Sequence, residues 1–150
     1  MLRGIPSVLS PDLLAVLCEM GHGDEIVIGD MNYPAAATAS NALIFANNVD
    51  SIRLLDAILR LMPLDRYVDK PFLIMERMAV DSRLFLPVHE DYFRLAEKYD
   101  PRGRDCVGYI NRFDFYDRAR DAYCVVATGE TSPYGCTILR KGCLKPEEVL

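Results

Sequence analysis

The sequence predicts an α/β fold, a single layered domain over residues 1–150 with helices packed on a central sheet. Short apolar runs of strand length alternate with longer segments whose apolar residues recur at helical spacing. The chain of 150 residues is long enough for one core, and 51% hydrophobic and 26% charged residues are the balance of a folded globule. No repeat, linker or low-complexity tract divides it. These patterns leave the strand order open.

Helices are predicted by capping residues and by apolar residues three or four positions apart. Ser10-Pro11 supplies a capping hydroxyl and then a proline at the first helical position, and Gly21 ends this helix. The clearest amphipathic pattern runs from Ser51 to Met62. On the outer faces we expect two i,i+4 ion pairs, Asp56–Arg60 and Asp114–Arg118. The other predicted helices are 35–40, 88–99 and 114–122.

Strands are predicted where short runs rich in β-branched residues lie between turn signals. Asn47-Asn48 is such a turn. Residues 76–86 fit neither period and remain unassigned. The predicted strands are 25–29, 42–46, 71–75, 106–110, 123–128 and 137–140.

The turn around His22 is the segment best shaped to bring backbone and a small molecule together. Glycines flank the histidine, the strand 25–29 follows, and Asp30 stands at its far end. A ligand beside the end of that strand would meet Asp30, with His22 at the preceding turn, an acid/base pair in outline. The alternative, favoured by the spacing alone, is a glycine cap whose histidine covers the last helical turn. The other histidine, His89, adjoins Glu90 and Asp91 and is predicted to lie on the surface.

Charge and cysteine usage exclude several functional classes. A net charge of −5 without a Lys/Arg cluster argues against a nucleic-acid partner. The five cysteines show no C-x-x-C spacing, so we expect neither a disulfide framework nor a metal site, and a reducing cytoplasm suits them. The apolar run 13–18 is too short for a signal peptide, and no segment approaches the length needed to cross a membrane.

Six short motifs together carry a resemblance to a known family. They occur in the same order as in that family and extend from the first helix nearly to the C-terminus. The chain resembles the fucose mutarotase and ribose pyranase family, and its Gly23, Asn-Arg-Phe-x-Phe-Tyr run and Tyr134-Gly135 are closest to the L-fucose mutarotase branch. Ser132-Pro133-Tyr134 is more similar to the pyranase branch. The motifs are Leu9-Ser10-Pro11-Asp12-Leu13-Leu14, Met20-Gly21-His22-Gly23-Asp24-Glu25 with Asp30, Pro63-Leu64-Asp65, Ile110-Asn111-Arg112-Phe113 with Phe115-Tyr116, Ala127-Thr128-Gly129-Glu130, and Tyr134-Gly135 with Ile138-Leu139-Arg140-Lys141-Gly142.

The resemblance implies an isomerase that interconverts the anomers of a reducing monosaccharide, with L-fucose as the expected sugar and no cofactor. It assigns catalytic roles to His22 and Asp65. A histidine suits a reaction in which each group must both take and give a proton. The residues that it places at the sugar are Asp30, Met75, Arg112, Tyr116, Tyr134 and Cys136.

Other roles remain open for several of these positions from the residues alone. Tyr116 fits a core aromatic at helical spacing, Arg112 a surface charge, Asp65 a turn residue and Met75 simple core. The family commonly has asparagine where Cys136 stands, and a thiol is a weaker hydrogen-bond partner. Phe45-Ala46-Asn47-Asn48 replaces a charged segment of the family. Alternative functions are ribose pyranose–furanose interconversion and non-catalytic sugar binding.

The resemblance also implies a homo-oligomer with sites where subunits meet. Bacterial members form rings of five paired into decamers, so a ring-based decamer is expected. His22, Asp30 and Asp65 fall in the first half of the chain, and Arg112 and the tyrosines in the second. A site shared between neighbours would let a small domain enclose a sugar.

Overall fold

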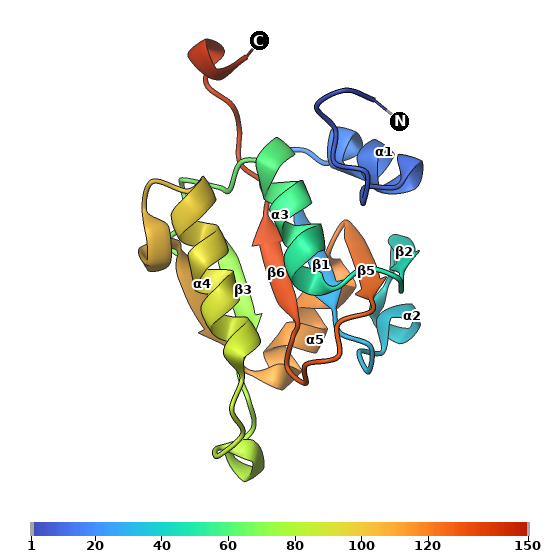
Figure 1. The fold of residues 1–150 in the computed structure, drawn as a ribbon, viewed down its shortest axis with the longest axis vertical. Helices are drawn as coiled ribbons and strands as arrows, with labels where there is room; N and C mark the ends of the chain where they lie inside the picture. Colours follow the sequence, from blue (N-terminus) through green and yellow to red (C-terminus); the bar gives the residue numbers. More distant parts are fainter. Residues whose placement is uncertain (1, 150) are drawn as a thin grey trace.

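The structure, a computed structural model that describes residues 2–149, contains one mixed six-stranded sheet (Figure 1). Its order is β2-β5-β1-β6-β3-β4. The pairs β1–β5, β2–β5 and β3–β4 are parallel, whereas β6 is antiparallel to both β1 and β3. The strands are β1 Glu25–Gly29, β2 Ala42–Ala46, β3 Phe72–Met75, β4 Val107–Ile110, β5 Cys124–Thr128 and β6 Thr137–Arg140.

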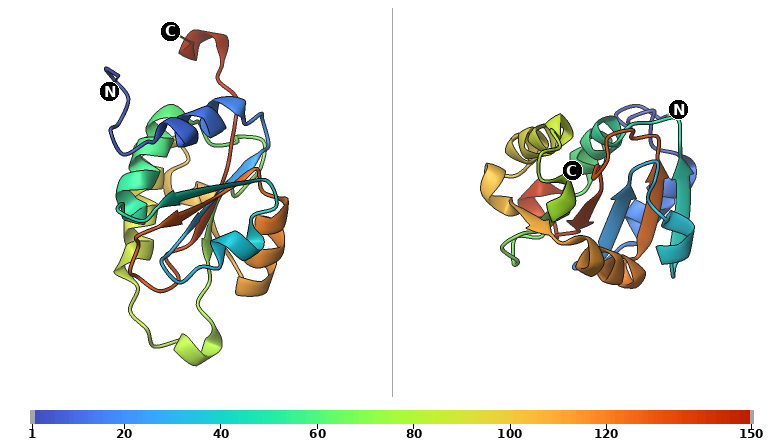
Figure 2. Two further views of the ribbon diagram at one scale, coloured as in Figure 1. Left: turned by 90° about the vertical axis from the view of Figure 1, so that its right-hand side faces the viewer. Right: turned by 90° about the horizontal axis from the view of Figure 1, so that it is seen from below.

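Helices cover both faces of the sheet (Figure 2). One face carries α1 Pro11–Glu19, α3 Ser51–Leu61 and α4 Pro87–Tyr99, and the other carries α2 Ala35–Thr38 and α5 Arg112–Asp121. The remaining helical turns are η1 Ala79–Asp81, η2 Gly103–Cys106 and η3 Pro146–Glu148. None of the helices in residues 2–149 has the length and apolar character required to traverse a membrane.

The strands divide the core into two layers because successive side chains point to opposite faces. Ile26 and Ile28 of β1 join the cluster under α1, α3 and α4, whereas Val27 joins the cluster under α2 and α5. Both clusters are buried, which explains why the strands are continuous apolar runs rather than alternating ones. The predicted α/β class with helices on a central sheet is confirmed.

Both predicted surface ion pairs are wrong, because partners from other elements compete successfully. Asp56 binds Lys98 Nζ at 2.6 Å and Tyr99 on the neighbouring helix α4. Arg118 binds Glu25 on β1 rather than Asp114. Helix periodicity shows neighbours within one helix only, so pairs formed by packing are invisible to it.

The predicted helices and strands are otherwise confirmed to within a few residues at their ends. Ser10 caps α1 by accepting a hydrogen bond from Leu13 N at 3.2 Å. The unassigned segment 76–86 is irregular apart from η1. It forms the loop that extends beyond the sheet at the lower end in Figure 1.

Gly129 generates a stability prediction, because a Cβ there would lie 2.2 Å from the carbonyl oxygen of Asn47. We expect Gly129→Ala to lower the free energy of unfolding by about 1–3 kcal/mol or more, since backbone must move to relieve the overlap. Denaturant unfolding of the variant measures this. Gly21→Ala is the control, because its Cβ would meet only Asp24 at 3.6 Å. Equal stability of the two variants would contradict the prediction.

Candidate functional site

The structure places the eight predicted site residues in two groups at opposite ends of β1. His22 and Asp65 lie at the end where β1 begins. The five residues of β1, at about 3.3 Å each, put the other group about 16 Å away. The acid/base pair of His22 and Asp30 outlined from the sequence is therefore not formed within one chain. The group beyond the carboxyl end of β1 comprises Asp30, Met75, Arg112, Tyr116, Tyr134 and Cys136.

His22 and Asp65 form a hydrogen-bonded dyad, with 3.1 Å between His22 Nε2 and Asp65 Oδ1. The His22 side chain is 46% exposed, whereas that of Asp65 is 2% exposed. The Nε2–H donates to the carboxylate, so the lone pair on Nδ1 is available to an incoming molecule. A buried carboxylate that orients an exposed imidazole is the arrangement of a general base with its orienting group.

Asp65 is held ionised by the donors around it. Burial alone would raise the pKa of its carboxyl group, but hydrogen bonds from Tyr67 N–H, His22 and Arg140 lower that pKa below its ordinary value. Tyr67 N donates to Oδ1 at 2.9 Å, so Asp65 also fulfils the turn role that its sequence context left open. The exposed ring of Tyr67 lies against His22, with 5.4 Å between ring centroids.

Asp30 and Cys136 meet beyond the carboxyl end of β1. Asp30 N–H donates to Cys136 Sγ at 3.3 Å, and Asp30 Oδ1 accepts from Asn32 N at 2.9 Å. Cys136 is 1% exposed, so its thiol supports Asp30 from inside and is not presented to the surface. Met75 N–H donates to the carbonyl of Cys136 at 3.0 Å, and Met75 is buried in the core, as its alternative role predicted.

The polar side chains of this second group come from α5 and from the loop before β6. Arg112 Nε donates to Tyr116 Oη at 2.9 Å, and Arg112 is exposed. Tyr134 has a left-handed backbone with φ 57°, which is unusual for a residue other than glycine. Its hydroxyl donates to Asp81 Oδ2 at 2.5 Å, a contact with the loop 76–86 that no sequence pattern indicated.

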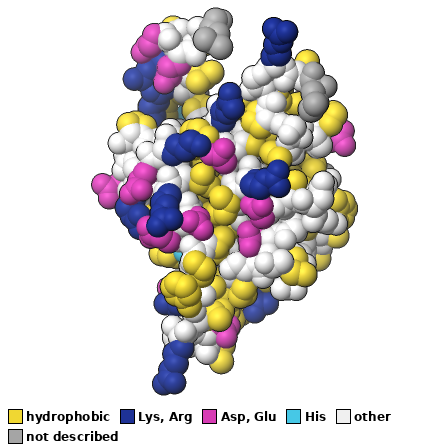
Figure 3. Space-filling model, in the orientation of Figure 1, with side chains coloured by type: hydrophobic (Ala, Val, Ile, Leu, Met, Phe, Trp, Pro, Cys, Tyr) yellow, Lys and Arg dark blue, Asp and Glu magenta, His cyan; other side chains and the backbone are white. Residues whose placement is uncertain are grey.

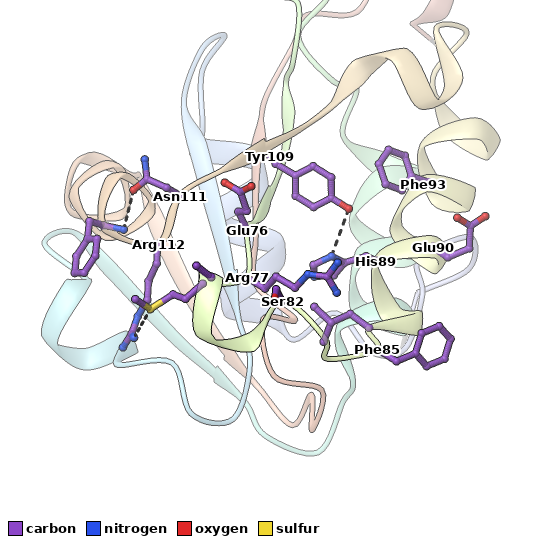
Figure 4. Close-up of a pocket in the computed structure, with 14 residues that line it drawn as sticks. Glu76, Arg77, Ser82, Phe85, His89, Glu90, Phe93, Tyr109, Asn111 and Arg112 are labelled. Carbon is purple, nitrogen blue, oxygen red and sulfur yellow. Dashed lines mark hydrogen bonds between the residues drawn. The ribbon is translucent and has the colours of Figure 1, made fainter.

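A cavity of about 880 Å³ opens beside Arg112, between the loop after β3, the start of α4 and the end of β4 (Figure 4). Of the predicted site residues, Arg112 lines it. Its other polar lining groups include Glu76, His89 and Tyr109. Phe85 and Phe113 on its rim are strongly exposed.

The surface position predicted for His89 is wrong. Its exposed fraction is 9%, and its ring packs near Tyr92 and Tyr109. Burial lowers the pKa of His89, and the neutral ring donates from Nε2 to the carbonyl of Tyr134 at 2.9 Å. A charged neighbour such as Glu90 indicates that its own face of α4 is exposed to solvent. His89, one residue earlier, lies on the buried face that packs toward the sheet. His89 thereby anchors the left-handed turn at Tyr134.

The described residues contain no group of three or more His, Cys, Asp or Glu side chains placed to hold a metal ion. The five cysteines are all free thiols. On the face drawn in Figure 3, acidic and basic side chains are interspersed rather than separated by sign.

Solved structures define the class to which this fold belongs. The chain is similar to FucU from Bifidobacterium longum, with a TM-score of 0.92 and 42% identity over 95% of this chain and 100% of that one. It is also similar to the fucose mutarotase in complex with L-fucose from Streptococcus pneumoniae, with a TM-score of 0.90 and 45% identity over 96% and 100%. RbsD of Bacillus subtilis, complexed with D-ribose, shares the fold at 20% identity and a TM-score of 0.70.

The chain belongs to the RbsD / FucU transport protein family, whose model matches residues 3–144. The human fucose mutarotase is 45% identical over 95% of this chain and 94% of its own length. The L-fucose mutarotase of Glaesserella parasuis is 45% identical over 95% of each chain. The resemblance drawn from the motifs is thus confirmed over nearly the whole chain.

The ionised Asp65 generates a pH prediction. Because folding lowers the pKa of this carboxyl group, its contribution to stability is present above the unfolded value of about 3.9 and is lost as pH falls through the folded value. We expect Asp65→Asn to lower the free energy of unfolding at pH 7 by about 1–3 kcal/mol. The difference from the wild type should shrink below about pH 4.

Denaturant unfolding between pH 3 and 7 measures this difference. Asp69→Asn, at an exposed position in the same segment, is the matched control. A gap between wild type and Asp65→Asn that stays constant with pH would contradict the pairing of Asp65 described here.

Proposed function

We propose that this protein interconverts the α and β anomers of L-fucose by general acid/base catalysis without a cofactor. Relatives named fucose mutarotase at 42–45% identity over nearly the full chain support the reaction and the sugar. The observation in the structure that carries the proposal is the exposed His22 whose Nε2 is bound to the buried carboxylate of Asp65.

The chemistry requires one proton to leave and one to arrive. In the proposed reaction, His22 Nδ1 takes the proton from the anomeric hydroxyl while an acid donates to the ring oxygen, and the ring opens to the aldehyde. Rotation about the C1–C2 bond and closure on the other face give the second anomer, with each group working in reverse. Asp65 stabilises the imidazolium that forms in between, and each positioned group contributes on the order of 10²–10⁴-fold.

The second group of residues is proposed to bind the sugar hydroxyls. Asp30 offers a carboxylate, Arg112 a guanidinium, and Tyr116 and Tyr134 phenolic hydroxyls. Met75 and Cys136 are buried beneath these residues and support them from the core. The cavity beside Arg112 shares this arginine with the group and is lined by both apolar and polar side chains, as in small-molecule sites generally.

We further propose that the complete site forms between copies of the chain, in a ring-based homo-oligomer for which a decamer is favoured. The separation of about 16 Å between the His22–Asp65 dyad and Asp30 supports this, because one fucose molecule is too small to contact both ends of β1. A heterologous contact that repeats and closes would bring the dyad of one copy to the hydroxyl-binding group of the next. The free thiols of all five cysteines are consistent with the cytoplasm as its location.

His22→Ala tests the catalytic assignment. We expect it to slow anomer exchange of L-fucose by about 100-fold or more while leaving the fold intact, because the imidazole is exposed and contributes no core contact. Saturation-transfer NMR with a chelator present measures exchange directly, and D-ribose provides the competing substrate. Asp69→Asn is the control for a surface substitution. Wild-type exchange rates in a folded His22→Ala protein would contradict the assignment.

Mixing two inactive variants tests the shared site. His22→Ala removes the base from one end of the chain, and Tyr134→Ala removes a hydroxyl-binding group from the other. If each site draws on two neighbours, random mixing in equal amounts restores both groups in about one quarter of the sites. Exchange rates after mixing measure this, and mass spectrometry of intact assemblies verifies subunit exchange. No recovery in assemblies proven to be mixed would contradict the shared site.

A further inference from the structure

Arg140, the last residue of β6, binds Asp65 through both its backbone and its side chain. Its carbonyl accepts from Asp65 N at 3.0 Å, and its Nε donates to Asp65 Oδ2 at 3.0 Å. We propose that Arg140 is the positioning residue that fixes the Asp65 carboxylate and thereby orients His22 for proton transfer. This inference rests on the function proposed above and adds a residue to its machinery.

Arg140 is itself held in place by a row of alternating charges across the sheet. Its Nη1 lies 3.7 Å from Glu25 Oε1. Glu25 is in turn bound at both oxygens by Arg118, at 2.8 Å from Nε to Oε2 and 2.5 Å from Nη2 to Oε1. Glu25 lies opposite Arg140 in the β1–β6 register, so the strand pairing sets the spacing of these charges. The guanidinium therefore has carboxylates on two sides and a fixed direction.

The guanidinium also packs over the turn that carries His22. Gly23 has a left-handed backbone with φ 89°, and a Cβ at this position would lie 3.1 Å from Arg140 Nη2. Two features therefore favour glycine at position 23: the left-handed backbone and the close approach of the Arg140 guanidinium. A cavity of about 310 Å³ lies beside them, lined by Gly23, Glu25, Arg118 and Arg140 among others.

Other charged or titratable side chains around the dyad have partners other than the Asp65 carboxylate. Arg102 donates to the backbone carbonyl of Asp65 and pairs with Asp100. Lys141 donates to the carbonyls of Leu17 and Met20. Asp24 accepts from the backbone of Gly21, and the exposed ring of Tyr67 lies beside His22. Among the described residues, Arg140 is the cationic side chain that contacts the second oxygen of Asp65.

The division of the Asp65 oxygens explains what Arg140 does. Oδ1 serves His22 and Oδ2 serves Arg140, so the carboxylate cannot rotate away from the imidazole. Arg140 also offsets part of the negative charge that His22 experiences. Without it, Asp65 would favour the protonated imidazole, which cannot accept a proton from the sugar. Loss of Arg140 should therefore slow the reaction at neutral pH and move its pH profile.

Kinetics of Arg140→Met, Arg140→Lys and the wild type test this inference. We expect kcat of Arg140→Met to fall by about 10- to 100-fold with little change in KM, because orientation rather than binding is lost. Its pH–rate profile should move to higher pH. Arg140→Lys should recover part of the rate, since it restores the charge but not the planar geometry. Arg120→Met, which removes an exposed arginine paired with Asp117, is the control.

Each outcome separates the two hypotheses. A wild-type protein that exchanges anomers, with Arg140→Met unchanged in rate and pH profile, overturns the role of Arg140 alone. A rate loss in Arg140→Met with an unmoved profile and no recovery in Arg140→Lys also overturns it, because that pattern belongs to a purely structural residue. A wild-type protein without exchange overturns the proposed function itself. The NMR signals of the two histidine rings, His22 and His89, report whether each variant is folded.

Discussion

The antiparallel insertion of β6 is the constraint on which the rest of the structure depends. β1 and β5 are parallel, as are β3 and β4, and β6 joins the two sets by pairing with β1 on one side and β3 on the other. Because it runs against its neighbours, its last residue lies where they begin and its first where they end. The last residue of β6, Arg140, thus reaches the His22–Asp65 dyad. Cys136, the residue immediately before β6, contacts Asp30 at the opposite end.

A buried carboxylate lies at each end of the sheet, Asp65 at one and Glu130 at the other, and the two have different kinds of hydrogen-bond partner. Asp65 is buried but contacts two cationic or protonatable side chains, so it remains charged and can orient an imidazole. Glu130, at the other end, accepts from Ser51 N, Ser51 Oγ and Ser132 N and lies at the start of α3, where a helix favours negative charge. Glu130 therefore fastens the loop before β6 to the helical layer. Ser132, two residues before the left-handed Tyr134, is part of this attachment, and His89 binds the carbonyl of Tyr134 itself.

Local patterns predicted the elements well because capping and periodicity act over a few residues. Ser10 caps α1 and the apolar run 25–29 forms β1 as expected. The failures concern contacts between distant segments. The sequence showed Glu90 beside His89 but not Tyr109 across from it, and it gave no reason to connect Arg140 with Asp65, 75 positions apart. The resemblance supplied the candidate site residues, and the strand directions determine which of those candidates lie close together.

Cys136 stands where the family commonly has asparagine, and its burial determines which contact this difference affects. Burial raises the pKa of the Cys136 thiol, which stays neutral and accepts from the backbone of Asp30. The thiol therefore supports the Asp30 turn from inside, and the proposed contacts to sugar hydroxyls fall to Asp30, Arg112 and the two tyrosines. A weaker acceptor at this position affects how firmly the backbone of Asp30 is held, because the thiol contacts the Asp30 N–H and not its carboxylate. Under the proposed assignment, sugar preference at this end depends on these four side chains, and the buried Cys136 gives no physical reason to move that preference away from L-fucose.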